Sequence, residues 1–142
     1  MQTWFKPLSV ALFLSATCLG CGEGEKQLPA TLSGTVMLDN APLETGTVQV
    51  IPFDPKLGSD SAVGIISGGK YTASTNQTVK GLKPGDYQIA VHSWTKEPQL
   101  EIGIEGVSAI PAKYNDIATS NLRVTITAGK TNTYDIVLSS KE

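Results

Sequence analysis

Apolar and polar residues alternate with a period of two through most of the chain after residue 30. The pattern is clearest over residues 32–38, 47–51, 87–92, 122–126 and 134–138. Successive side chains of a β-strand point to opposite faces, so this alternation predicts strands with one buried face. In residues 87–92 it places Tyr87, Ile89 and Val91 inward, with Gln88, Ala90 and His92 on the opposite face.

Residues typical of turns separate these segments. They are Asp39-Asn40, Gly68-Gly69, Pro84-Gly85-Asp86 and Ala128-Gly129-Lys130, and we expect Gly85 and Gly129 to adopt turn conformations. Two further short strands, 62–67 and 70–74, flank Gly68-Gly69 as a hairpin. Residues 94–121 form a long excursion in which at most Pro111–Asp116 makes one helical turn.

Seven short strands without intervening helices indicate antiparallel pairing, because parallel neighbours need long crossover connections. We therefore predict an all-β fold, an antiparallel seven-stranded β-sandwich over residues 30–140. Composition agrees with this prediction. Charged residues make up 17% of the chain, below the roughly 25% of average soluble domains.

The N-terminal residues have a different pattern. Lys6 precedes an uncharged apolar run, residues 8–19, which is too short to cross a hydrocarbon core of about 30 Å as a helix. The run ends at Gly20-Cys21, and polar residues follow. This arrangement predicts a lipoprotein signal peptide (1–20), a lipidated Cys21 and a flexible tether over residues 21–29.

Two alternatives to lipidation remain open at this point. The leader could be an ordinary cleaved signal, or Cys18 and Cys21 could form a redox pair or half of a zinc site. Under the lipidation hypothesis, the protein is attached to a membrane by its lipid and lies on the extracytoplasmic side of the cell envelope. Gly22, where inner-membrane lipoproteins often carry Asp, favours an outer membrane if the cell has one.

Charge argues against a nucleic-acid partner. The formal net charge is −2, the lysines are scattered, and Arg123 is the single arginine. Nucleic-acid binding requires a clustered basic face to contact phosphates. The expected partners are instead the membrane, through the lipid anchor, and an envelope protein or glycan.

Several segments resemble carboxypeptidase regulatory-like domains. They are Ser33–Leu43 (SGTVMLDNAPL), Gly46–Val50, Gly69-Lys70-Tyr71 and Gly81–Tyr87 (GLKPGDY). The resemblance implies a prealbumin-like (transthyretin-like) sandwich, a type of domain that accompanies catalytic domains without being catalytic. Ile110–Tyr114, followed by Thr119–Leu122, is similar to small lipoproteins of planctomycete-type bacteria.

Candidate chemistry is sparse. A Ser-His-Asp arrangement would have to use His92, the single histidine, and zinc needs three or four nitrogen or sulfur ligands. The transthyretin-like hydrolases need several histidines and a C-terminal Tyr-Arg-Gly-Ser, which this chain lacks. We therefore expect no catalytic residue, metal or cofactor. Calcium binding by the Asp54–Asp60 loop stays open, and Glu97, Glu101 and Glu105 are predicted to lie in a solvated loop.

His92 and Trp94 form the best candidate for a ligand-binding face, because Trp94 continues the face of His92 beside the long excursion. The expected role is that of a non-catalytic, lipid-anchored cell-envelope module with a structural or binding function. The alternative is a glycan- or peptide-binding accessory protein that partners a separate enzyme.

Overall fold

A computed structural model describes residues 26–75 and 79–141. The predicted signal peptide and Cys21 lie outside these residues. The last part of the predicted tether belongs to the fold. Strand β1 (Lys26–Gln27) pairs in parallel with β7 (Val79–Lys80), and the N–H of Leu28 donates to the carbonyl of Lys80 at 2.7 Å. The first described strand therefore begins five positions after Cys21.

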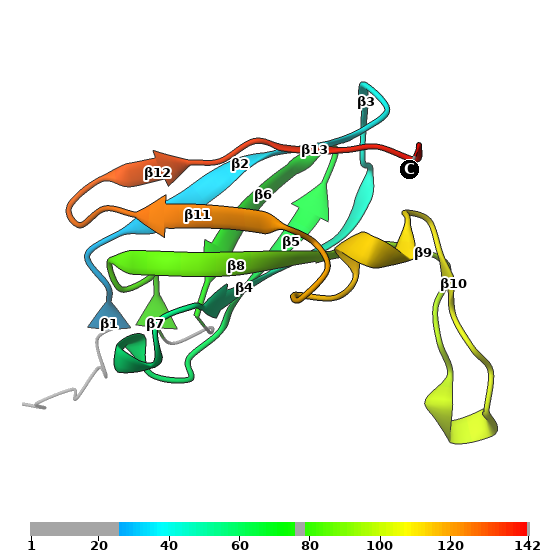
Figure 1. Ribbon diagram of the computed structural model, residues 1–142, viewed down its shortest axis with the longest axis horizontal. Coiled ribbons are helices and arrows are strands. Elements are labelled where there is room, and N and C mark those ends of the chain that lie inside the picture. Colours follow the sequence, from blue (N-terminus) through cyan, green and yellow to red (C-terminus); the bar gives the residue numbers. More distant parts are fainter. Residues whose placement is uncertain (1–25, 76–78, 142) are drawn as a thin grey trace, which may run out of the picture.

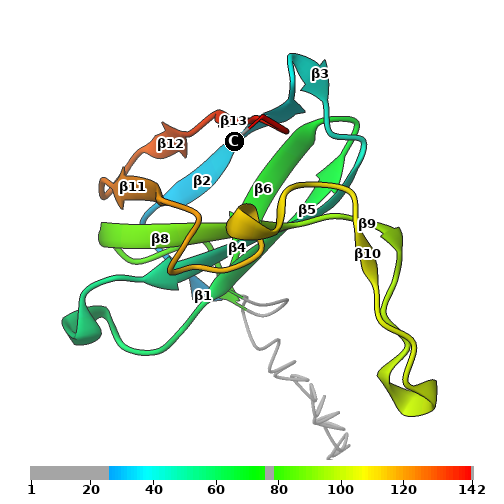
Figure 2. The same cartoon turned by 45° about the vertical axis from the view of Figure 1, so that its right-hand side comes forward.

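The body of the protein is one curled, mainly antiparallel sheet (Figures 1 and 2), so the predicted all-β fold class is confirmed. Its hydrogen-bonded order is β11-β8-β4-β5-β6-β2-β12, and the short strands β3 and β13 also pair with β2. The bounds are β2 (Thr31–Leu38), β3 (Ala41–Pro42), β4 (Thr45–Pro52), β5 (Ala62–Ser67), β6 (Lys70–Ser74), β8 (Gly85–His92), β11 (Leu122–Ile126), β12 (Thr131–Thr133) and β13 (Ile136–Leu138).

The C-terminal pairing was not anticipated. The predicted last strand, residues 134–138, contains β13, and a further strand, β12, precedes it; both run parallel to β2. Their connection to β11 crosses from one edge of the sheet to the other, which brings the two edge regions close together (Figure 1). Within the described residues the helical segments are three 3₁₀ turns, η1 (Pro55–Leu57), η2 (Leu100–Ile102) and η3 (Ala112–Tyr114), and none of the described helices is long and apolar enough to cross a membrane.

The core lies inside the curled sheet and is formed mainly by the side chains that the alternation places inward. The largest fully buried side chains are Leu32, Val36, Val48, Val50, Ile66, Leu82, Ile89, Val91, Ile126, Ile136 and Leu138. Neighbouring strands supply facing pairs, such as Val48 on β4 beside Val91 on β8. Apolar area removed from water stabilises this arrangement at about 25 cal/mol per Å².

One face of β8 differs from the prediction. Tyr87, Ile89 and Val91 are buried as expected, but Ala90 on the opposite face is also only 1% exposed. The excursion returns across the outer side of the strand: η3 contacts β8, and the hydroxyl of Ser120 donates to the carbonyl of Ile89. This long-range packing buries a position that alternation alone assigns to the surface.

The glycines at the predicted turns behave differently from each other. Gly129 lies in the turn between β11 and β12 with φ of 68°, as expected. Gly85 is instead the first residue of β8, with φ of 148°, and a Cβ there would lie 2.4 Å from Cδ1 of Leu57. Gly85 therefore begins a strand and does not lie within the turn, but the expected conformation costly for other residues is present, because L side chains rarely adopt a φ of 148°. Close packing against Leu57 of η1 is a second reason for glycine at this position.

Candidate functional site

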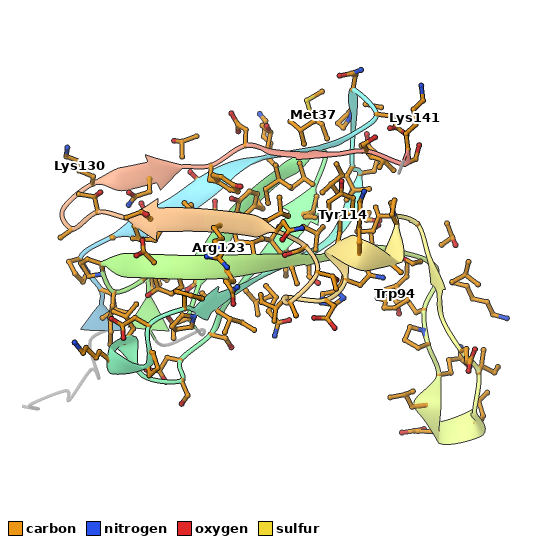
Figure 3. The ribbon with its side chains drawn as sticks, in the orientation of Figure 1. Met37, Trp94, Tyr114, Arg123, Lys130 and Lys141 are labelled. Carbon is orange, nitrogen blue, oxygen red and sulfur yellow. The ribbon has the colours of Figure 1, made fainter. Side chains whose placement is uncertain are left out.

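The candidate site lies where a β-hairpin leaves the sheet. After β8, the chain continues through Ser93 into β9 (Trp94–Lys96), turns at η2, and returns as β10 (Val107–Ser108), antiparallel to β9. Figure 1 shows this hairpin projecting from the domain, and Figure 3 shows Trp94 at its base. The sequence predicted an irregular excursion here, so the hairpin is a new feature.

The structure brings His92 and Trp94 together. Their ring centroids are 6.5 Å apart, and the ring planes are inclined by 21°. His92 is half-buried and Trp94 is 37% exposed, so both rings are accessible from solvent. This spacing follows from residues i and i+2 of an extended segment, whose side chains share one face.

Ser93, between the two rings, holds the segment in place. It is 3% exposed and its hydroxyl donates a hydrogen bond to the carbonyl of Thr45 at 2.7 Å. Its carbonyl accepts from the N–H of Ala109 at 2.8 Å, which fixes the returning strand. These contacts tie the base of the hairpin to β4, and they set the orientation of the aromatic pair.

An open cleft of about 430 Å³ adjoins the two rings. Its wall is formed by β4, the end of β8 and the first residues of the hairpin: Thr45, Gly46, Thr47, His92, Trp94, Glu97 and Pro98. Gly46 packs too closely against the end of β8 for a side chain, since a Cβ would lie 2.4 Å from the carbonyl oxygen of His92. The cleft thus combines apolar ring faces with hydroxyl and carboxylate groups, a composition typical of small-ligand sites.

Gly106 positions the indole from the other side of the hairpin. A Cβ at residue 106 would lie 3.0 Å from Cε3 of Trp94 and 2.8 Å from Cδ of Pro98. Only a glycine at this point lets the returning segment pack against both the indole of Trp94 and the ring of Pro98. The role of Gly106 could not be found from local sequence, because the residues it contacts lie across the hairpin.

The glutamates of the hairpin are exposed, as predicted for a solvated segment. The prediction did not place any of them in a site, yet Glu97 lines the cleft. Its carboxylate is a hydrogen-bond acceptor beside two aromatic rings.

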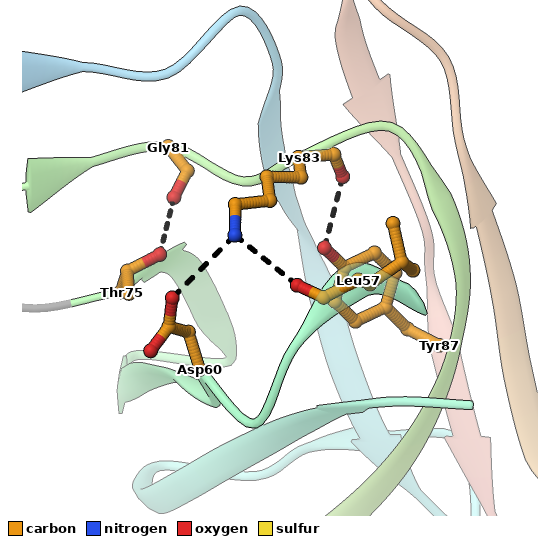
Figure 4. A network of polar contacts seen from close by, with 6 residues as sticks. All are labelled: Leu57, Asp60, Thr75, Gly81, Lys83 and Tyr87. Atoms are coloured by element: carbon orange, nitrogen blue, oxygen red, sulfur yellow. Dashed lines mark hydrogen bonds and ion pairs between the residues drawn. The ribbon is translucent and has the colours of Figure 1, made fainter. Parts of the chain in front are cut away.

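Both carboxylates of the Asp54–Asp60 loop have partners in the protein. Asp54 caps η1 by accepting from the N–H of Lys56 at 2.9 Å, and Asp60 lies 3.6 Å from Nζ of Lys83. The same ammonium donates to the carbonyl of Leu57 at 3.1 Å (Figure 4). Over residues 26–75 and 79–141, no group of three or more His, Cys, Asp or Glu side chains is placed to hold a metal ion.

The ionisable groups with shifted pKa values form hydrogen bonds that stabilise the folded domain. Burial raises the pKa of Tyr71 and of Tyr87, whose hydroxyls donate to the carbonyls of Tyr134 and Lys83 at 2.8 and 2.9 Å. Hydrogen bonds lower the pKa of the Asp39 and Asp135 carboxyls, with Ser140 and Thr35 as their partners. None of these four groups is among the residues that line the cleft.

Neither protein-family models nor curated proteins match this sequence. Among solved structures, the chain is similar to the dioxygenase domain of a dioxygenase carbohydrate-binding protein fusion from the cellulolytic bacterium Streptomyces sp. SirexAA-E. The two are 18% identical, the match covers 96% of this chain and 93% of that one, and the TM-score is 0.38. A likeness of this degree carries no inference about function.

Proposed function

We propose that this protein is a non-catalytic binding module of the cell envelope, anchored to a membrane by lipid on Cys21. It has the organisation of a carboxypeptidase regulatory-like domain, and it binds its ligand in the cleft of His92 and Trp94. The observation that carries this proposal is the aromatic pair, with ring centroids 6.5 Å apart, beside an open cleft.

The anchor rests on the leader sequence. Gly20-Cys21 ends a short apolar run, and the described fold begins at Lys26. A lipid on Cys21 would therefore hold the domain close to the membrane surface. Lys26 and Gln27, at the end of the predicted tether, already pair with β7.

A binding role agrees with the surroundings of His92. Its imidazole lies beside the indole of Trp94, on a sheet face whose neighbouring position on β4 is Thr47. Nucleophilic catalysis needs a base oriented toward a nucleophile by a third group. The arrangement here instead places two neighbouring aromatic rings along a cleft, which suits recognition.

A glycan is the ligand class that the cleft favours. The apolar C–H face of a sugar ring packs against an aromatic π-face, whose negative potential attracts the C–H groups. The hydroxyls of Thr45 and Thr47 and the carboxylate of Glu97 are placed to exchange hydrogen bonds with sugar hydroxyls. An extended peptide has fewer hydroxyl partners to offer and is the second candidate.

Binding is tested with the membrane-extracted mature protein on an array of bacterial envelope and plant glycans. Trp94→Ala is expected to weaken binding about tenfold, because an aromatic contact contributes roughly 0.5–1.5 kcal/mol beyond its area burial. Ile65→Ala is the matched control, since Ile65 is 74% exposed on β5 and outside the cleft. Equal losses for both variants, or peptide binding that ignores Trp94, would contradict the assignment.

The anchor is tested separately by mass spectrometry of the mature N-terminus. We expect a lipid-modified Cys21 at the N-terminus and its loss in Cys21→Ser. An unmodified N-terminus at another residue would contradict the anchor and leave the cleft assignment standing.

A further inference from the structure

The projecting hairpin carries an unusual concentration of exposed aliphatic side chains. Leu100 is 86% exposed, Ile102 is 67% exposed and Val107 is 54% exposed. Leu100 and Ile102 both belong to η2, at the tip of the hairpin, where the neighbouring residues Pro98, Gln99 and Glu101 border a second open depression. Large exposed apolar groups gathered at one place mark an interaction surface.

The hairpin is held together by its own hydrogen bonds. Gln99 and Ile104 exchange two backbone bonds of 3.0 and 3.1 Å, and Gly103 closes the tip in a left-handed conformation with φ of 68°. The side-chain hydroxyl of Thr95 donates to the carbonyl of Val107 at 3.0 Å. An isolated two-stranded hairpin is marginally stable in water, so a surface that covers its tip would stabilise it.

The direction of the hairpin indicates what that surface is. Figures 1 and 2 share a vertical axis, and in both views β1 lies at the lower side of the sheet while the hairpin tip projects toward the same side. Cys21 precedes Lys26 by five positions, which reach about 17 Å when fully extended. A lipid on Cys21 would thus bring a bilayer within reach of the side toward which η2 points.

We propose that the tip of the hairpin docks on the membrane that holds the lipid anchor, with Leu100 and Ile102 inserted among the lipids. This inference rests on the proposed lipidation of Cys21. It adds a second contact with the bilayer, remote from the first, so that the domain is oriented as well as tethered. The cleft at the base of the hairpin is then held at a defined height above the lipid headgroups.

The charges of the hairpin specify the kind of membrane. Glu97, Glu101 and Glu105 outnumber Lys96, so the hairpin is negative and anionic headgroups repel it. A 3₁₀ turn has three residues per turn, so Glu101 points away from both Leu100 and Ile102 and stays among the headgroups during shallow insertion. The docking surface is therefore a bilayer rich in zwitterionic lipid, and the attraction is hydrophobic.

The test uses the full lipoprotein, expressed with its leader, extracted and reconstituted into phosphatidylcholine vesicles. Cys18 is removed with the leader and the thiol of Cys21 is consumed by the lipid, so one introduced cysteine is the single site for a spin label. Labels are placed by Leu100→Cys and Ile102→Cys. Ile65→Cys on β5 is the matched control, because Ile65 is an equally exposed aliphatic residue away from the hairpin.

We expect the labels at 100 and 102 to collide with dissolved oxygen and to be shielded from a water-soluble nickel complex. The label at 65 should remain open to the nickel complex. High salt should leave the shielding unchanged, and added phosphatidylglycerol should reduce it. Leu100→Glu should leave the protein on the vesicles but expose a label at Ile102→Cys to the nickel complex.

Three outcomes would overturn the docking. If the protein stays on vesicles while the labels at 100 and 102 are as open to nickel as that at 65, the tip does not touch lipid. If these labels are immobilised yet still reached by nickel, a protein surface or a second copy covers the tip. If the protein does not remain with the vesicles at all, the anchor on Cys21 is wrong as well.

Discussion

The carboxylate of Asp135 accepts two hydrogen bonds from Thr35, one from its backbone N–H and one from its hydroxyl, both 2.8 Å long. Asp135 lies in the two-residue interruption between β12 and β13, the two short strands that pair with β2. The N–H of Tyr134 donates to the carbonyl of Ser33 at 2.9 Å beside it. One carboxylate thus ties the C-terminal strands to the first long strand.

Asp135→Asn is expected to lower stability at neutral pH, because the amide accepts these bonds less strongly than the charged carboxylate. The hydrogen bond from the Thr35 backbone holds the pKa of Asp135 below its ordinary value of 3.8. The stabilisation is therefore fully present above about pH 4–5 and is lost as the pH falls through the folded-state pKa. Urea melts of both proteins at pH 7 and at pH 3 should show the difference shrinking in acid. A difference that grows in acid would contradict this assignment.

Val91→Asp is expected to prevent folding. Val91 is fully buried and pairs with Val48, and a carboxyl group placed there without a partner costs several kcal/mol. That cost approaches the whole stability of about 5–15 kcal/mol of a typical domain. Gln88→Asp is the control, because Gln88 lies beside Arg123 on the half-buried face of the same strand. Equal urea midpoints for the two variants would contradict the strand orientation.

Gly34→Ala tests how closely β2 approaches the final segment. A Cβ at residue 34 would lie 2.0 Å from the carbonyl oxygen of Tyr134, which itself accepts from the hydroxyl of Tyr71. Overpacking of this kind costs typically 1–3 kcal/mol, and we expect a loss in that range by chemical denaturation. Gly129→Asn should cost less than Gly34→Ala, because no heavy atom lies within 4 Å of an added Cβ and Asn tolerates a φ of 68° better than most residues. A neutral Gly34→Ala would mean that the two segments separate easily.

Ser93→Ala is expected to loosen the base of the hairpin. It removes the hydrogen bond to the carbonyl of Thr45 and leaves that acceptor without this partner, at a cost of about 1 kcal/mol. Glycan binding should weaken as well, because Ser93 sets the orientation of the rings on either side of it. Thr125→Ala is a suitable control, since Thr125 bonds to Asp86 on the exposed side of β11 and β8. Tryptophan fluorescence of Trp94 and array binding measure the two effects, and unchanged values in Ser93→Ala would contradict a positioning role.

Local patterns predicted much of the sheet. The hairpin of β5 and β6 has the predicted bounds, and Asp39 and Asn40 take the positive φ values of 50° and 68° that the turn required. Such features depend on neighbouring residues only: alternation, glycine pairs and residues that tolerate the left-handed region. The shared face of His92 and Trp94 follows from the same period of two.

The sequence by itself determined the all-β class, most inward positions and the candidate aromatic pair, because each depends on residues within one strand or turn. It also predicted the lipid anchor on Cys21, which lies outside the described residues. Tertiary structure alone decided that β12 and β13 pair in parallel with β2, that Ala90 is buried, and that residues 94–108 form a projecting hairpin which completes a cleft with β4. These features arise from contacts between segments far apart in the chain, and no local periodicity encodes which distant surfaces meet.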